Sequence, residues 1–183
     1  VMVRGSTEKT LQYLLEILPD LKNIFVPFHV GNSPAKICVI DLKKAADKFD
    51  GLTIIVKDVN DSEELLASLE EIPDETGAIW LTHSNMITGK AEEIAEFSNK
   101  RKIPIASPVS LAKVGVLISY SADFHKIGKQ ISRLANKALK GIAPSSLPIE
   151  TAEFFLEINV KTARIIGVEV PSHVINQAEH IFR

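Results

Sequence analysis

Three short polar segments of this chain carry side chains that could bind a small ligand or move a proton. They are His29-Val30-Gly31-Asn32-Ser33, Thr82-His83-Ser84-Asn85 and Ser107-Pro108-Val109-Ser110. Neutral polar groups around a cleft suit reversible binding better than catalysis, which usually needs a titrating group with a shifted pKa. We therefore predict a binding site, and its candidate residues are His29, Asn32, Ser33, Thr82, Ser84, Asn85, Ser107 and Ser110.

Asn32 and Ser33 stand at the start of a predicted helix. Free N–H groups and the helix dipole favour an anion at such a point, and a ligand carboxylate is the obvious small one. The Ser33 hydroxyl is also a natural N-cap for the same helix. Capping alone and capping combined with a ligand contact both stay open at this stage.

His29 and His83 are the candidates for chemistry, because with Asp123 they could form a proton-transfer pair. Neither histidine has an adjacent nucleophile or an orienting carboxylate that the sequence makes evident. The sequence therefore favours a hydrogen-bonding or solvent-facing role for both.

Common cofactor signatures are missing from the chain. No Gly-x-Gly-x-x-Gly follows a strand, and the Thr88-Gly89-Lys90 segment fails as a phosphate loop because Ser84 replaces its first glycine and Ala91 follows the lysine. There is no His-Glu-x-x-His or Cys-x-x-Cys, and the five histidines are scattered. We expect neither a cofactor nor a metal site.

The composition and charge of the chain argue against some classes of binding partner. The chain has 183 residues, 24% of them charged, with a net charge of −2 and no basic stripe, so we expect no nucleic-acid surface. Its apolar runs have the length of strands rather than membrane spans. This stretch opens directly in a helix pattern and shows no signal peptide. The single cysteine, Cys38, has apolar neighbours, which indicates core packing.

Apolar runs alternate with amphipathic segments along the whole chain. This pattern predicts an α/β fold in which parallel strands are covered by helices on both faces, and the three polar segments then share the rim where such sheets bind ligands. The predicted strands are residues 24–28, 52–56, 78–81, 103–106, 116–120 and 154–158. The predicted helices are residues 7–18, 34–49, a segment capped by Asp61 or Ser62, 88–100, 123–140, a short one capped by Asn159, and a final one from Pro171-Ser172.

Several motifs occur in an order typical of one family. They include Asn32-Ser33-Pro34-Ala35 after a strand, Ile103-Pro104-Ile105, Gly115-Val116-Leu117-Ile118-Ser119-Tyr120 and Glu157-Ile158-Asn159-x-x-Thr162-Ala163-x-x-Ile166-Gly167. With these, the chain resembles the carboxyl-terminal part of the solute-binding proteins of ABC importers, in the branch with tryptophan- and tyrosine-type binders. The resemblance covers nearly all of the chain.

The resemblance implies a type I periplasmic-binding fold, in which two α/β lobes joined by hinge strands close on a small organic ligand, such as an amino acid, without chemistry. It also implies an ABC permease as partner and a periplasmic or extracellular, membrane-anchored lipoprotein. We expect residues 1–114 to form a ligand-binding lobe, 115–152 a crossover segment, and 153–183 the carboxyl-terminal strand and helices. An acidic residue common in the family near residues 107–109 is absent here.

The family's whole first lobe is also missing from this chain. The resemblance implies that residues 116–140 belong to that lobe, which would leave the apolar face of the helix at 126–140 without its partners. We therefore expect self-association through 116–140 or a rearranged carboxyl-terminal half. Two other functions stay open: the sensory domain of a membrane signalling protein, and a small α/β transferase or isomerase using His29 and His83.

Overall fold

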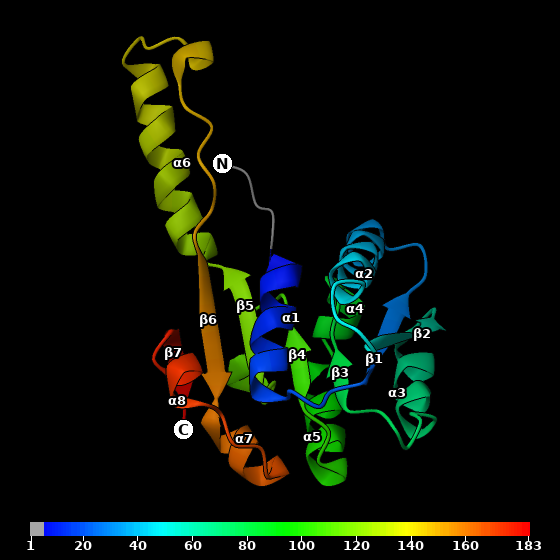
Figure 1. The fold of residues 1–183 in the computed structure, drawn as a ribbon. Coiled ribbons are helices and arrows are strands. Elements are labelled where there is room, and N and C mark those ends of the chain that lie inside the picture. Colours follow the sequence, from blue (N-terminus) through cyan, green and yellow to red (C-terminus); the bar gives the residue numbers. More distant parts are fainter. Residues whose placement is uncertain (1–5) are drawn as a thin grey trace.

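A seven-stranded sheet in the order β2-β1-β3-β4-β5-β6-β7 organises the protein, whose computed structural model describes residues 6–183 (Figure 1). β1 to β5 are parallel, whereas β6 runs antiparallel to β5 and β7 runs parallel to β6. The predicted α/β fold is confirmed. The strands are β1 (Asn23–His29), β2 (Thr53–Val59), β3 (Ala78–Trp80), β4 (Ile105–Ser107), β5 (Ile118–Ala122), β6 (Phe154–Asn159) and β7 (Ala178–Phe182).

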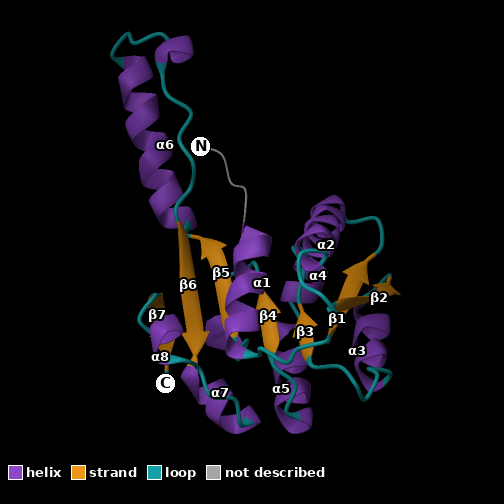
Figure 2. Ribbon diagram, in the orientation of Figure 1, coloured by secondary structure: helices purple, strands orange, loops and turns teal. Residues whose placement is uncertain are grey.

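Helices cover both faces of this sheet (Figure 2). The apolar side chains of α1 (Ser6–Ile17), α2 (Ser33–Ala46) and α8 (Ser172–Ile175) form a core on one face. Those of α3 (Ser62–Glu70), α4 (Asn85–Thr88) and α5 (Ala91–Arg101) form a second core on the other. The remaining helical elements are α6 (Phe124–Leu139), α7 (Val160–Ile166) and the short turns Ala112–Val114 and Pro144–Ser146.

The two cores hold the central strands in place. Trp80 of β3 is fully buried in the first core, and Ile79 beside it is fully buried in the second, as expected for a strand covered on both faces. Cys38 of α2 is only 3% exposed, which confirms its predicted place in the core. Burial raises the pKa of its thiol and so keeps it protonated.

Side-chain caps define where several helices begin. Asp61, Asp123 and Asn159 cap α3, α6 and α7, which agrees with the sequence. For α2 the prediction of Ser33 as the N-cap was wrong. Ser33 is the first helical residue, and the cap is Asn32, whose Oδ1 atom accepts the Ala35 N–H at 2.8 Å. Serine and asparagine are almost equally good caps, so residue type alone does not separate them.

The carboxyl terminus differs from the prediction of a final helix. α8 has four residues, and Ala178–Phe182 then forms β7 along the outer edge of β6. A strand there satisfies backbone N–H and C=O groups that β6 would otherwise leave unpaired. The edge of the partner strand therefore decides the conformation of this segment.

The crossover segment divides into two parts. β5 lies inside the sheet, between β4 and β6, whereas α6 extends away from the sheet and the chain returns beside it (Figure 1). The Arg133 guanidinium lies 2.7 Å from both carboxylate oxygens of Glu150 on the returning segment. In α6 only Ile127 is buried, while Ile131 and Leu139 are 51% and 87% exposed. The strand thus belongs to this lobe, and the helix presents an unpartnered apolar face.

No helix within residues 6–183 combines the length and the apolar character needed to cross a bilayer.

Asn159 supplies a test of how α7 is attached to the lobe. Its buried Oδ1 atom accepts the Thr162 N–H at 2.8 Å, and its Nδ2 atom donates to the Ala112 carbonyl at 2.8 Å. Asn159→Ala removes both the cap and the buried bond to the Ala112 carbonyl, which then keeps only the Gly115 N–H, so we expect a loss of about 2–3 kcal/mol in the free energy of unfolding. Urea denaturation measures it.

The control is Asp61→Ala, which removes only an exposed cap and should cost about 1 kcal/mol. Equal losses in the two variants would show that the bond from Asn159 to Ala112 does not stabilise the lobe.

Candidate ligand-binding site

A cavity of about 510 Å³ opens at the edge of the sheet where β3, β4 and β5 end. This volume is in the range of small-molecule sites. Most of its polar lining comes from two of the segments singled out in the sequence, and its apolar lining includes two aromatic residues. The polar residues are His83, Ser84, Asn85, Thr88, Ser110 and Ser121, and the aromatic ones are Phe124 and Phe154.

Ser84 joins two of the polar segments. It is 2% exposed, and its Oγ atom lies 2.9 Å from the Nδ1 atom of His29. Ser84 is also the residue before α4, but its hydroxyl makes no capping bond, so it is free to serve His29. His29 itself does not line the cavity; it supports Ser84 from the end of β1.

Thr82 and Ser107 are fully buried beneath the loops that line the cavity and do not line it themselves. The Ser107 Oγ atom accepts the Val109 N–H at 3.0 Å and so shapes the loop that carries Ser110. The burial of Thr82 and Ser107 does not fit a direct ligand contact. Thr82 stands two residues after the end of β3 and Ser107 is the last residue of β4, and both of these short central strands are buried.

Asn32 and Ser33 lie in a different cavity, of about 500 Å³, beside α2 and β2. The predicted anion site at the start of α2 is largely used up by the protein itself. Pro34 has no N–H, and the Asn32 side chain and carbonyl accept the N–H groups of Ala35 and Lys36. Only the Ser33 N–H remains for an anion there. Asn32 and Ser33 therefore lie apart from the cavity at the ends of β3, β4 and β5, whereas His29 of the same segment contacts Ser84.

A third cavity, of about 300 Å³, adjoins the first, and the two share Ser110, Ser121, Ala122 and Phe124. It contains a carboxylate that the sequence analysis did not select. Glu157 of β6 is 8% exposed, and the Ser110 hydroxyl lies 2.8 and 2.9 Å from its two oxygens. A charged residue inside the apolar run Phe154-Phe155-Leu156-Glu157-Ile158 was the signal that could have found it.

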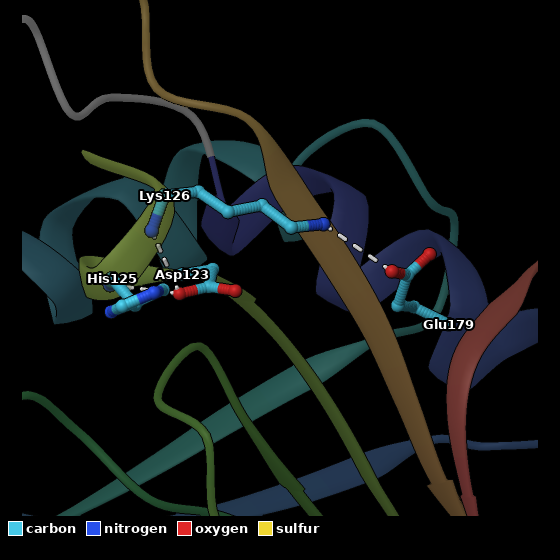
Figure 3. A network of polar contacts seen from close by, with 4 residues as sticks. All are labelled: Asp123, His125, Lys126 and Glu179. Atoms are coloured by element: carbon cyan, nitrogen blue, oxygen red, sulfur yellow. Dashed lines mark hydrogen bonds and ion pairs between the residues drawn. The ribbon is translucent and has the colours of Figure 1, made fainter. Parts of the chain in front are cut away.

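The start of α6, whose polar contacts Figure 3 shows, contributes Asp123, Phe124 and His125 to the lining of this third cavity. The Asp123 carboxylate accepts the N–H groups of His125 and Lys126 at 2.8 and 3.1 Å. These bonds lower its pKa, so it is ionised at neutral pH. The Lys126 ammonium is 3.3 Å from Glu179 of β7 and 3.6 Å from the centre of the Phe155 ring.

These positions do not assemble a proton-transfer site from His29, His83 and Asp123. The His29 ring contacts Ser84, His83 lines the first cavity, and the Asp123 carboxylate caps α6 beside the adjoining one. Desolvation lowers the pKa of His83, so its imidazole is neutral at pH 7 and can act as a hydrogen-bonding group. Within residues 6–183 no group of three histidine, cysteine or acidic side chains is arranged to hold a metal ion.

The fold and the cavity at the strand ends define a lobe of the periplasmic-binding class. The sequence profile of the family described as "ABC transporter substrate binding protein" matches residues 4–182, and the chain belongs to this family. Its members are periplasmic or extracellular solute-binding proteins, not enzymes. A curated relative, an uncharacterized protein of Rickettsia prowazekii, is 24% identical over 79% of this chain and 48% of its own length.

Solved structures show the same fold. An ABC domain from Streptococcus pneumonia in complex with L-Trp has a TM-score of 0.83 at 23% identity, and the match covers 100% of this chain and 64% of that one. A substrate-binding protein with adhesive properties from Clostridium difficile, in its ligand-free open form, has a TM-score of 0.81 at 21% identity. That match covers 97% of this chain and 60% of the other. The chain therefore spans about half to two thirds of the length of these proteins.

The pKa of His83 provides a test of the site's electrostatics. We expect its NMR titration midpoint below the ordinary value of 6.5, because desolvation penalises the imidazolium. His83→Gln identifies the resonance. A folded-state pKa below the unfolded one means that this group's contribution to stability is present above pH 6.5 and is lost as the pH falls below it. A midpoint at or above 6.5 would contradict the desolvated environment.

Proposed function

We propose that this chain is one lobe, with the hinge, of the solute receptor of an ABC importer. It binds a small organic ligand in the cavity at the ends of β3, β4 and β5 and closes over it without chemistry. The observation that carries this proposal is the lining of that cavity. His83, Ser84, Asn85 and Ser110 offer neutral hydrogen-bonding groups beside the rings of Phe124 and Phe154, which suits reversible binding.

A second lobe completes the site in this proposal. Phe124 lines the cavity and is nevertheless 79% exposed, so one side of the site is uncovered. The apolar face of α6 lacks partners, and related proteins are longer than this chain. The resemblance implies a first lobe that would cover both the open side of the cavity and the apolar face of α6. Residues 123–152 then pack on that lobe, and β5 and β6 act as hinge strands. Closure buries the ligand between the strand-end edge of this lobe and the facing edge of the first lobe.

An amino acid is the ligand that we propose. The support is the bound L-Trp of the pneumococcal protein, which has the same fold, together with the neutral and aromatic lining of this cavity. An ABC permease is the proposed protein partner, and the proposed location is the periplasm or the cell exterior, with a lipid anchor outside the residues given. A receptor of this kind concentrates its solute for the permease and leaves it unchanged.

Ligand binding can be tested on the full-length protein. In a thermal-shift screen of the twenty standard L-amino acids, we expect at least one to raise Tm by several degrees, because a ligand that binds only the folded state stabilises it by mass action. Asn85→Ala should then weaken binding of that amino acid about 5–10-fold, the worth of one hydrogen bond.

The matched control is Asn176→Ala, at the end of α8 and outside the cavity, which should bind as tightly as the wild type. Equal losses in the two asparagine variants, or no shift with any amino acid, would contradict the proposed site.

The apolar face of α6 makes a separate prediction for the 183-residue chain expressed alone. We expect it to self-associate through Ile131 and Leu139, because an apolar patch that has no partner drives association. Light scattering after size exclusion should show a mass above that of the monomer. The double substitution of Ile131 and Leu139 by lysine should reduce this association.

Ile37→Lys is the matched control, because Ile37 is 60% exposed on α2, away from α6, and its substitution should leave the association unchanged. A dispersed monomer of the unsubstituted chain would contradict this prediction.

A further inference from the structure

Glu157 is a buried acid that no part of this lobe neutralises. It is 8% exposed, and within residues 6–183 it makes no ion pair with a lysine, arginine or histidine. Among the residues that the structure describes, the carboxylate's one hydrogen-bond donor is the Ser110 hydroxyl, which has one proton to share between two oxygens. Burying an ionised carboxylate without a paired cation costs several kcal/mol, so this arrangement calls for a positive partner.

The basic residues in and beside this cavity make no ion pair with Glu157. Lys126, which follows the lining residue His125, is paired with Glu179 (Figure 3), and its ammonium also lies over the Phe155 ring. His125 and His180 line the cavity, but neither ring makes an ion pair or hydrogen bond with Glu157. The cavity therefore presents net negative charge from Glu157 and Asp123 to whatever enters it.

The position of Glu157 connects it to the ligand site. Ser110 bonds its carboxylate and also lines the larger cavity, and the two cavities have Ser110, Ser121, Ala122 and Phe124 in common. A ligand seated among the residues at the ends of β3 and β4 needs only to extend past Ser110 to reach Glu157. Phe155 lines the smaller cavity too, but the Lys126 ammonium already lies over its ring, so Glu157 is the group there that can receive a ligand cation.

We propose that Glu157 is the specificity-determining residue of the site and selects ligands that carry a protonated amine. The ammonium group donates to the Glu157 carboxylate, and Ser110 orients that carboxylate. This inference rests on the proposed function, since it assigns a ligand class to the same site. The loop at residues 107–109 has no acid of its own. Glu157 on β6, 47 residues after Ser110 in the sequence, then supplies one.

The test uses full-length protein and two matched pairs of probes in titration calorimetry. L-tryptophan is compared with 3-indolepropionate, and L-leucine with 4-methylpentanoate, because each second compound lacks only the amine. We expect one or both amino acids to bind and the paired acids to bind at least about 30-fold more weakly. Glu157→Gln keeps the size of the side chain and a partner for Ser110 but removes the charge, so it should weaken amino-acid binding by a similar factor.

Glu153→Gln is the matched control, because Glu153 is an exposed acid just before the same strand and should bind the amino acids like the wild type. If a compound without the amine binds as tightly as its amino acid, the role of Glu157 is overturned while the binding function stands. If Glu157→Gln lowers Tm but leaves amino-acid affinity unchanged, Glu157 is structural and the inference fails. If none of the four probes binds the wild type, both the inference and the proposed amino-acid receptor are contradicted.

Discussion

The parallel pairing of β3, β4 and β5 is the constraint on which the site depends. Because these strands run in one direction, the segments that follow them meet at one edge of the sheet. The register sets Ile79 beside Ile105 and Ala106 beside Ile118, which brings the loop at 82–85 next to the loop at 107–111. Two apolar cores fix these strands from opposite faces, and no polar residue of the edge has to stabilise the sheet.

The antiparallel pairing of β6 with β5 brings Glu157 next to the cavities. Antiparallel pairing places Glu157 beside Ser119, two residues before Ser121 on the wall shared by the two cavities. The same pair of strands leads into α6 and back, so the chain leaves the lobe and returns to it through neighbouring strands (Figure 1). In the proposed receptor this pair of strands acts as the hinge, and the second lobe moves while the hydrogen bonds of the sheet remain intact.

Local sequence signals predicted most of the elements, and long-range pairing explains what they missed. Apolar runs bounded by Asp61, Asp123 and Asn159 were sufficient for strands and helix starts, because these caps act within three residues. They could not predict that Asn32 and Ser33 face a separate cavity, since this depends on β1 lying between β2 and β3. The formation of β7 depends on the free edge of β6, and the place of Glu157 beside the cavities depends on its contact with Ser110, 47 residues away in the sequence.

Hydrogen exchange on the full-length protein tests most directly whether the edge formed by β3, β4 and β5 is a ligand-binding surface. Exchange is measured by mass spectrometry with and without a saturating mixture of the twenty standard L-amino acids. The account predicts slower exchange in residues 83–89 and 109–111 and at the start of α6, with β2 unchanged. Protection confined to residues away from this edge, or no protection at all, would contradict the account.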